Sequence, residues 1–283
     1  MQNHTRIDVD SSINSGQVFL WKKIEKNWFG INGQDVLKID ESGNINQYKN
    51  VEMDFFRNRD DIKKIIKSIS RDATTKQSII KYPGLRIIDQ DPFQCLISFI
   101  VSSNSNIQKI KKNLEDITIK FGSKIKFENR EFFLFPSPKQ IACASINEIF
   151  DCGVGYRAKY VKNAAEMVYS KEIKLEELRE ASYEEAKIHL KNIPGVGNKV
   201  ADCILLFSLD KLEAFPLDTW TIRILQKYQK FEFDTKLSLT SSMKKYIIKS
   251  QIILGHMQDI HSNFSSRWKE KNIRKNGCKP LKW

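Results

Sequence analysis

The sequence predicts an α+β protein in which an N-terminal antiparallel sheet precedes a domain of α-helices. Between residues 16 and 50, apolar and polar residues alternate and turn signals recur, as in a meander of short strands. From Asp91 onward the apolar residues recur at helical spacing. Residues 190–218 indicate a helix, a glycine-rich hairpin and a second helix. The two periodicities therefore divide the chain into a sheet part and a helical part.

Four strands are expected in the first part, with turns at Asn32-Gly33 and Ser42-Gly43, because Asn-Gly favours tight hairpins. The expected strands cover residues 17–24, 27–31, 35–39 and 44–48. A helix from about Asp60 to Ile69 follows them. We therefore expect a sheet domain with its flanking helix over residues 1–85, a helical domain over 86–265 and a basic tail over 266–283.

Helix-start signals recur through the second part. Asp91 and Ser137 each precede a proline at the first helical position, and Ser182 forms a capping box with Glu185. With the apolar periodicity, these signals predict helices over residues 92–103, 106–121, 138–150, 156–170, 183–192, 199–209, 219–228 and 240–260.

Composition favours a partner that is a polyanion. The 283 residues carry 47 Lys and Arg against 34 Asp and Glu, a formal net charge of +13. Such a balance attracts a phosphate backbone, although a solvated lysine-rich surface would give the same count. No apolar run approaches the roughly 18 residues of a membrane span, and the first residues lack the apolar core of a secretory signal. We expect an intracellular protein with no membrane partner.

Cysteine and histidine spacing indicates no metal centre. The five cysteines are scattered without a Cys-x-x-Cys pair, which favours reduced thiols and excludes an iron–sulfur cluster bound by four clustered cysteines. The four histidines offer no zinc spacing. No metal site and no required cofactor are therefore expected.

The hairpin Ile193-Pro-Gly-Val-Gly197 has the composition of an anion site. Glycine permits the torsions of a tight turn, and the backbone amides of such a turn, with the start of the next helix, bind anions. An ordinary helix–helix turn would use the same residue types. The narrower pattern Pro-Gly-Val-Gly-x-Lys-Val-Ala-Asp favours binding of a DNA phosphate by Gly195, Val196 and Gly197, to which a monovalent cation at the hairpin could bridge.

Lys199 and Asp218 together indicate chemistry on a sugar. A lysine amine, with an ordinary pKa of about 10.4, is a nucleophile only when neutral. Lys199 falls in the first turn of a predicted helix, where a cation is disfavoured, so a functional reason for it is expected. Attack on C1′ would displace a base and leave a Schiff base, and β-elimination would then break the strand. Asp218 would stabilise positive charge on the sugar, and it is equally suited to cap the following helix.

Together with the hairpin, three blocks of sequence in the same order resemble the 8-oxoguanine DNA glycosylases of the helix-hairpin-helix superfamily. They are Ser-Gly-Gln-Val-Phe-Leu-Trp (15–21), the segment 90–107 beginning Gln-Asp-Pro-Phe, and Gly-Val-Gly-Tyr-Arg-Ala-Lys-Tyr-Val (153–161). The similarity extends to about residue 264. The resemblance implies a TBP-like fold for the antiparallel sheet domain, a helical domain in two parts with the active site between them, and flipping of the target base out of the duplex.

The resemblance also implies roles for single residues. Lys199 would be the Schiff-base nucleophile and Asp218 its acidic partner. The backbone carbonyl of Gly16 would accept the N7 hydrogen that distinguishes 8-oxoguanine from guanine. Cys203, one turn after Lys199, would stack on the base, although a cysteine there is equally at home in the core. Gln258 would read the Watson–Crick edge of the base, unless it is simply a solvated helix position.

A second set of residues would contact the DNA around the flipped base. Asn104 and Arg157 match residues that contact the cytosine left unpaired, and Tyr156 matches the wedge that fills the stack. The alternatives are a helix C-cap for Asn104, a core aromatic for Tyr156 and a surface arginine for Arg157. Lys109 stands where the family has an arginine, so selectivity for cytosine is expected to be relaxed.

One further departure concerns the phenylalanine that sandwiches the base in the family. Ser262 falls at its position, with Phe264 two residues on, so either the alignment slips there or base stacking is weaker.

These observations predict a bifunctional DNA repair glycosylase, active as a monomer on double-stranded DNA that contains oxidised guanine. It would excise 8-oxoguanine and cleave the strand, in the nucleoid or cytoplasm of a prokaryote or the nucleus of a eukaryote. A helix-hairpin-helix glycosylase for another oxidised or alkylated base is the nearest alternative. Lys199 argues against alkylbase enzymes, which keep only the aspartate. A non-catalytic DNA-binding module would leave Lys199 and Asp218 without a joint purpose.

Overall fold

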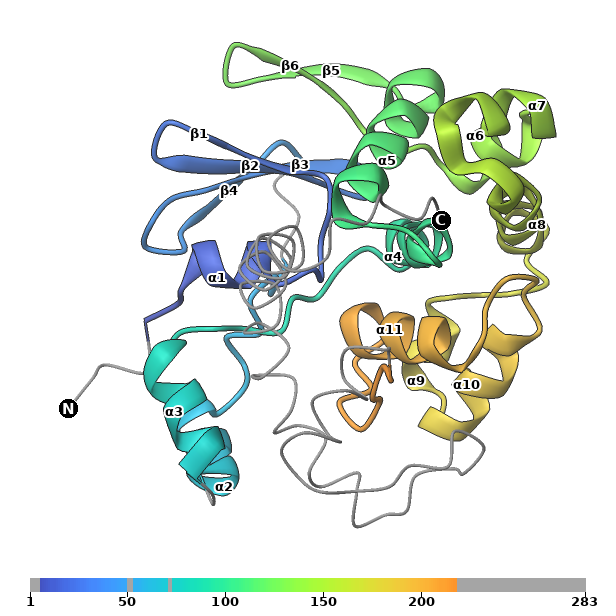
Figure 1. Cartoon of the computed structure of the whole chain (residues 1–283). Helices are drawn as coiled ribbons and strands as arrows, with labels where there is room; N and C mark the ends of the chain where they lie inside the picture. The colour runs from blue at the N-terminus through green and yellow to red at the C-terminus, as the bar shows by residue number, and fades with distance from the viewer. Residues whose placement is uncertain (1–5, 50–52, 71–72, 218–283) are drawn as a thin grey trace, which may run out of the picture.

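The computed structural model describes residues 6–49, 53–70 and 73–217, and it confirms an antiparallel sheet followed by helices (Figure 1). Strands β1 (Trp21–Ile24), β2 (Asn27–Asn32), β3 (Asp35–Ile39) and β4 (Ile45–Gln47) pair in chain order. The predicted Gly33 turn joins β2 to β3 with φ of +59°, a conformation that glycine adopts readily. The predicted tail and the helices expected over 219–228 and 240–260 lie outside the described residues.

The first predicted strand is shorter than expected. Residues 17–20 precede β1, because the buried Gln17 bonds to another segment instead of a neighbouring strand. The side-chain Nε2 of Gln17 donates to the carbonyl of Arg86 over 2.9 Å, and its Oε1 accepts from the backbone N of Ile88 over 2.9 Å. These bonds attach the start of the sheet to the segment that leads into the helical domain.

Three helices accompany the sheet domain. The helix α2 (Ile62–Ile69) matches the expected one and begins after the N-cap Asp61. The helices α1 (Val9–Asn14) and α3 (Ala73–Lys81) were not expected from the sequence. Asp8 caps α1 by accepting from the backbone N of Ser11, so a local signal for α1 was present.

The two faces of the sheet belong to two hydrophobic clusters. Leu37 and Ile39 point to the face covered by α1 and Phe55, whereas Val36 points to the opposite face and joins the large core of the helical domain. This alternation follows from the two-residue period of a strand. The sheet therefore packs between its own small core and the helices.

The helices of the second domain are α4 (Pro92–Ser102), α5 (Ile107–Phe121), α6 (Pro138–Cys143), α7 (Ile146–Ile149), α8 (Ala158–Tyr169), α9 (Glu177–Glu180), α10 (Tyr183–Lys191) and α11 (Asn198–Ser208). The helix α9 was not expected from the sequence, whereas the others overlap predicted helices. Residues 92–101 of α4 are all buried, so this helix is the centre of the domain. It packs against α5, α8 and α11. None of the described helices is long and apolar enough to cross a bilayer.

Two predictions for this domain were wrong in detail. The expected helix 138–150 is two helices, because Ser145 forms a new capping box with Glu148 and restarts the chain as α7. A π-helical segment (Phe150–Val154) and a 3-10 turn (Gly155–Arg157) then precede α8, which begins two residues later than expected.

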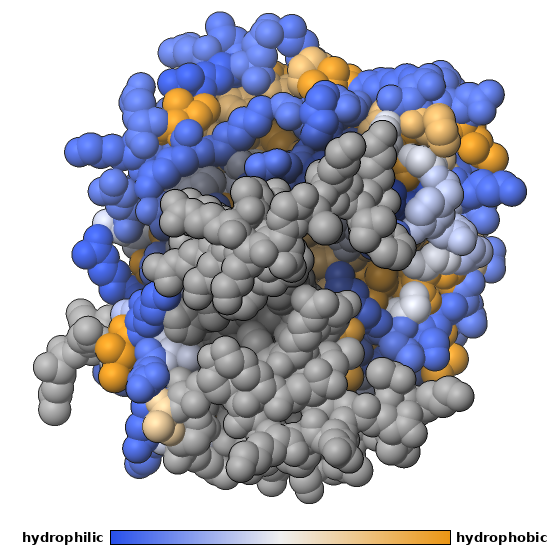
Figure 2. All heavy atoms as spheres, viewed as in Figure 1, coloured by the Kyte–Doolittle hydropathy of each residue, from blue (hydrophilic) through white to orange (hydrophobic). Residues whose placement is uncertain are grey.

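A β-hairpin inside the helical domain was also not expected. Strands β5 (Lys124–Phe127) and β6 (Arg130–Phe133) extend beside the N-terminal sheet (Figure 1). Phe132 stacks on Phe29 of β2 at 5.8 Å between ring centroids, and Glu128 accepts from Lys38 over 2.7 Å. The hairpin thus braces the helical domain against the sheet. Hydrophilic residues cover most of the described surface on the face that Figure 2 shows.

Candidate functional site

The glycine-rich hairpin lies between α10 and α11, as the sequence predicts. Gly195 has φ of +88°, and a Cβ there would lie 2.6 Å from Cγ of Tyr160 in α8. Val196 is buried at 5% exposure, while Gly195 and Gly197 are exposed. Gly197 is the N-cap of α11 and provides no side-chain cap, so the first amides of this helix have no capping side chain. This is the local arrangement of a helix N-terminus that binds an anion.

A buried polar cluster joins the two helices of the hairpin. Asp202 of α11 is 5% exposed and accepts from the Tyr183 hydroxyl over 2.8 Å and from Lys187 Nζ over 2.9 Å. Burial raises the pKa of the Asp202 carboxyl, against the hydrogen bond and the charge of Lys187. Burial and the neighbouring carboxylate also raise the pKa of Tyr183. Sequence reasoning missed this cluster, although an aspartate on an otherwise apolar helix was a usable signal.

Lys199 lies in the first turn of α11, half-buried against α4. Its Nζ is 3.5 Å from the Oγ of Ser102 and 5.2 Å from the ring centroid of Phe99. The Phe99 ring stacks on Phe207 at 5.6 Å and meets Phe19 edge-on at 5.8 Å. Sequence reasoning found Lys199 but neither of its contacts on α4.

The segment that carries Gly16 is attached to the end of α11. Gly16 has φ of +86° and follows α1. Gln90 donates from its side chain to the carbonyl of Gln17 over 2.9 Å and from its backbone to the carbonyl of Phe207 over 2.9 Å. Cys203, on the same helix, is 3% exposed. The structure therefore ties the segment containing Gly16 to the helix that carries Lys199 and Cys203.

Asn104, Tyr156 and Arg157 lie together at the end of α4. Arg157 is only 5% exposed, and its guanidinium donates to the carbonyls of Ser103 (2.7 Å), Val154 (2.9 Å) and Asn104 (2.9 Å). Asn104 is the residue after the C-cap of α4 and has φ of +49°. Tyr156 is 59% exposed, with the guanidinium 4.8 Å from its ring centroid. The alternative interpretation of Arg157 as a surface arginine is therefore wrong, because its side chain is buried against main-chain carbonyls.

The remaining predicted residues are separate or outside the described part. Lys109 is exposed in the first turn of α5, where its backbone N donates to the N-cap Asn106 over 2.9 Å. Four residues singled out in the sequence, Asp218, Gln258, Ser262 and Phe264, lie outside the described residues.

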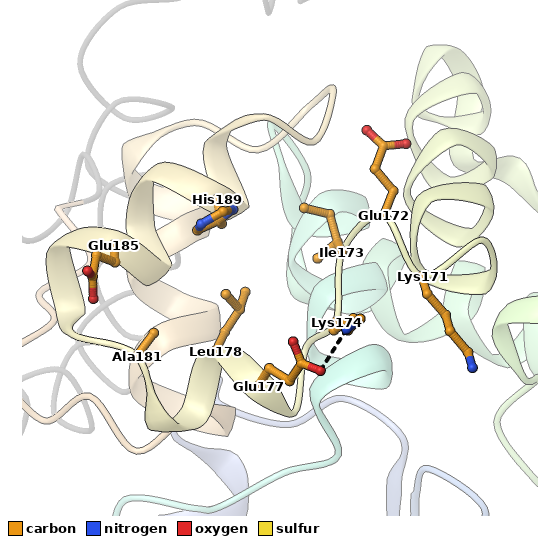
Figure 3. A pocket seen from close by; sticks show the side chains of 9 residues that line it. All are labelled: Lys171, Glu172, Ile173, Lys174, Glu177, Leu178, Ala181, Glu185 and His189. Carbon is orange, nitrogen blue, oxygen red and sulfur yellow. Dashed lines mark hydrogen bonds and ion pairs between the residues drawn. The ribbon is translucent and has the colours of Figure 1, made fainter.

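A cavity of about 420 Å³ lies away from these residues (Figure 3). Its lining comes from the end of α8 to α10 and comprises Lys171, Glu172, Ile173, Lys174, Glu177, Leu178, Ala181, Glu185 and His189. Charges of both signs face it, and Lys174 pairs with Glu177 at 2.9 Å. Across the described ranges, no group of three or more His, Cys, Asp and Glu residues could hold a metal ion.

Matches to two known families together cover all of the described residues. Residues 97–248 match the family described as HhH-GPD superfamily base excision DNA repair protein. Residues 1–96 match the family described as 8-oxoguanine DNA glycosylase, N-terminal domain.

Individual relatives agree with these matches. The chain is 35% identical over 162 residues to a probable N-glycosylase/DNA lyase of Methanothermobacter thermautotrophicus, covering 50% of this chain and 52% of the relative. It is 39% identical over 150 residues to N-glycosylase/DNA lyase OGG1 of Arabidopsis thaliana, covering 51% and 41%. The matches thus span about half the length of these curated relatives.

A solved structure matches over a greater length. The 8-oxoguanine glycosylase/lyase of Clostridium acetobutylicum, in complex with double-stranded DNA containing cytosine opposite 8-oxoG, is 30% identical, with a TM-score of 0.78. The match covers 90% of this chain and 93% of that chain.

Proposed function

The chain belongs to the HhH-GPD superfamily of base excision DNA repair proteins. We propose that it is a bifunctional 8-oxoguanine DNA glycosylase and lyase. One observation carries the proposal. Lys199 lies in the first turn of α11, directly after the exposed glycine hairpin, and its amine lies against α4, whose last residue is two positions before Asn104. The proposed nucleophile, the proposed phosphate site and the candidate base contacts therefore belong to one region of the fold.

The hairpin would hold a phosphate of the damaged strand. The amides around Gly195 and Gly197, with the uncapped start of α11, offer donors to an anion, and a monovalent cation there could bridge to the phosphate. The net charge of +13 adds an attraction to the DNA backbone that does not depend on the base sequence. Binding at this point would place the sugar next to Lys199.

The DNA would be distorted where the turn after α4 meets the 3-10 turn Gly155–Arg157. We propose that the exposed Tyr156 enters the base stack when the damaged nucleotide leaves it. Asn104 and Arg157 would contact the cytosine left behind, Asn104 from the turn that Arg157 holds. Lys109, with a point charge in place of a planar guanidinium, would read that cytosine less strictly.

The damaged base would be recognised from three directions. The carbonyl of Gly16 would accept the N7 hydrogen, Cys203 would pack on the base plane, and Gln258 would bond to the Watson–Crick edge. The bonds from Gln90 to both Gln17 and Phe207 support the first two assignments, because they hold the Gly16 segment against α11.

The chemistry would proceed through a covalent intermediate. The lone pair of the neutral Lys199 amine forms a bond to C1′, and the bond from C1′ to the base breaks with its electron pair leaving on the base, which takes up a proton. The attacking nitrogen, positively charged after bond formation, loses one of its protons. The nitrogen lone pair then expels the ring oxygen, which is protonated, and a protonated Schiff base remains. Loss of a C2′ proton gives an enamine, whose electrons expel the 3′ phosphate and cleave the strand. Asp218 would stabilise the positive charge on the sugar.

Borohydride trapping tests this function. Hydride reduces the Schiff base to a stable amine, so we expect a covalent complex with duplex DNA that contains 8-oxoguanine. Lys199→Gln should abolish trapping, excision and strand cleavage while DNA binding survives. Lys139→Gln is the matched control, because Lys139 is the second residue of α6, as Lys199 is of α11, and it is exposed. An adduct that persists in Lys199→Gln would overturn the proposal, and loss of DNA binding would indicate a structural lysine.

Opposite-base and substrate comparisons separate the alternatives. Excision of 8-oxoguanine opposite each of the four bases should show a weak preference for cytosine because of Lys109. Excision of an oxidised pyrimidine or an alkylated purine, but not of 8-oxoguanine, would favour the other glycosylase classes. DNA binding without any excision would favour a binding module. We further propose that the protein acts as a monomer and is located inside the cell together with the DNA.

A further inference from the structure

Two side chains of α4 contact the amine of Lys199, and neither contact was expected from the sequence. Ser102 lies in the last turn of this helix, and Phe99 lies one turn before it. We propose that Ser102 and Phe99 are positioning residues that orient the amine of Lys199 for attack on C1′. The inference rests on the proposed function, since it assigns the direction in which that nucleophile points.

The Ser102 hydroxyl is available to the lysine as an acceptor. It donates its own proton to the carbonyl of Phe99 over 2.8 Å, so its lone pairs remain for another donor. The Nζ of Lys199 lies 3.5 Å from this oxygen, at the long end of a hydrogen bond. Ser102 would therefore take one N–H of the amine in a fixed direction.

The Phe99 ring provides the second contact. The Nζ is 5.2 Å from the ring centroid, within the distance at which an aromatic face attracts an ammonium group. Phe99 is 3% exposed, and contacts with Phe207 and Phe19 hold the ring in place. Because α4 is the buried centre of its domain, both contacts belong to a rigid element.

Together these contacts determine where the lone pair of the neutral amine points. A neutral amine has two N–H bonds and one lone pair in a tetrahedral arrangement. With one N–H on Ser102 and the other on the face of Phe99, the lone pair is directed away from α4. The ammonium form makes the same contacts, so loss of its third proton exposes the lone pair without reorganising the side chain. Orienting a reacting group before the reaction is a recognised source of rate acceleration in enzymes.

Lyase activity on a preformed abasic site distinguishes positioning from other roles. The same amine attacks C1′ whether or not a base is present, so a change in its orientation should slow base excision and cleavage of abasic DNA by the same factor. A side chain that only lines the base pocket would affect excision alone. A side chain that only stabilises the fold would lower stability and leave both rates per folded molecule unchanged.

The experiment compares single-turnover rates at saturating enzyme for Ser102→Ala, Ser102→Thr and Phe99→Leu. Loss of one neutral hydrogen bond predicts a decrease of about 2- to 10-fold for Ser102→Ala on both substrates. Loss of the weak contact between the neutral amine N–H and the ring predicts a decrease of about 2- to 5-fold for Phe99→Leu. Ser102→Thr keeps the hydroxyl and should recover most of the Ser102→Ala loss. Affinity for DNA should stay within about twofold of the wild type, since neither residue is placed at a phosphate.

Phe93→Leu is the matched control for the core. Phe93 is in the same helix, is 7% exposed and makes an edge contact with Phe135, but it has no contact with Lys199 among the described interactions. The unfolding midpoint of Phe93→Leu should be lowered about as much as that of Phe99→Leu, while its rates of base excision and abasic cleavage stay at the wild-type values. Equal rate losses in Phe93→Leu and Phe99→Leu, or unchanged abasic cleavage in Ser102→Ala, would overturn the inference. Failure of the wild type to form a borohydride adduct would instead refute the proposed function.

Discussion

The two glycines of the hairpin should respond in opposite ways to an added methyl group. Gly195 has φ of +88°, and a Cβ there would lie 2.6 Å from Cγ and 2.8 Å from Cδ2 of Tyr160. Gly197 has φ of −90°, and a Cβ there would meet no atom within 4 Å. The pair therefore compares a strained, crowded glycine three positions before α11 with an unstrained, open glycine at its N-cap.

The magnitudes follow from these environments. Placing alanine in a left-handed conformation costs about 1–2 kcal/mol. Displacing the Tyr160 ring adds roughly 1–3 kcal/mol, as for overpacking elsewhere. Alanine also restricts the unfolded chain, which offsets about 0.4–1 kcal/mol. We therefore expect Gly195→Ala to lower the free energy of unfolding by about 1–5 kcal/mol, and Gly197→Ala to leave it unchanged or raise it slightly.

Urea denaturation measures the free energy of unfolding, and fluorescence anisotropy with duplex DNA measures affinity. The denaturation slope should stay constant across the three proteins, so that the midpoints report stability. Gly197→Ala should still weaken DNA binding, because the methyl group would occupy the open space where a phosphate approaches. Equal stability losses for the two variants would refute the conformational reasoning. Normal DNA affinity of Gly197→Ala would refute the position given to the phosphate.

Three further predictions concern residues that support the site. Lys187→Met should lower stability at pH 7 by about 2–3 kcal/mol, because it leaves the buried Asp202 carboxylate without its cation. Burial already raises the pKa of Asp202, so the stability linked to its protonation is present at low pH and lost as pH rises through the folded pKa. The stability difference between Lys187→Met and the wild type, measured by urea denaturation, should therefore shrink on acidification. Arg157→Met should lower stability by about 2–4 kcal/mol by removing three bonds to carbonyls, and Arg157→Lys should recover only part of it. Burial raises the pKa of the Cys95 thiol, so mass spectrometry after iodoacetamide should find the exposed Cys143 alkylated in the native protein and Cys95 only after unfolding.

Local signals were sufficient wherever a structure depends on residues three or four apart. The N-caps Asp91, Ser137 and Ser182 each accept from the backbone N three residues on. The same rule, applied to Ser145 and Glu148, would have divided the helix predicted over 138–150. Such bonds form within one turn, so the sequence alone contains the information.

Signals failed where a segment is stabilised by distant partners. The strands β5 and β6 had a local signal, since Lys124–Phe127 alternates polar and apolar residues, but each is only four residues long and packs on the sheet through contacts such as Phe132 with Phe29. The first predicted strand begins four residues late because the side chain of Gln17 bonds to residues about seventy positions away. Neither contact leaves a local pattern in the sequence.

The sequence by itself determined the glycine hairpin, the helix that carries Lys199, and the family to which the chain belongs. Only the tertiary structure decided what surrounds the amine of Lys199. Ser102 lies 97 positions from Lys199 in the chain, and Phe99 lies three residues before Ser102 on the same helix. Helix periodicity places each side chain on a face of its own helix, but the meeting of two faces depends on how all the helices pack around α4.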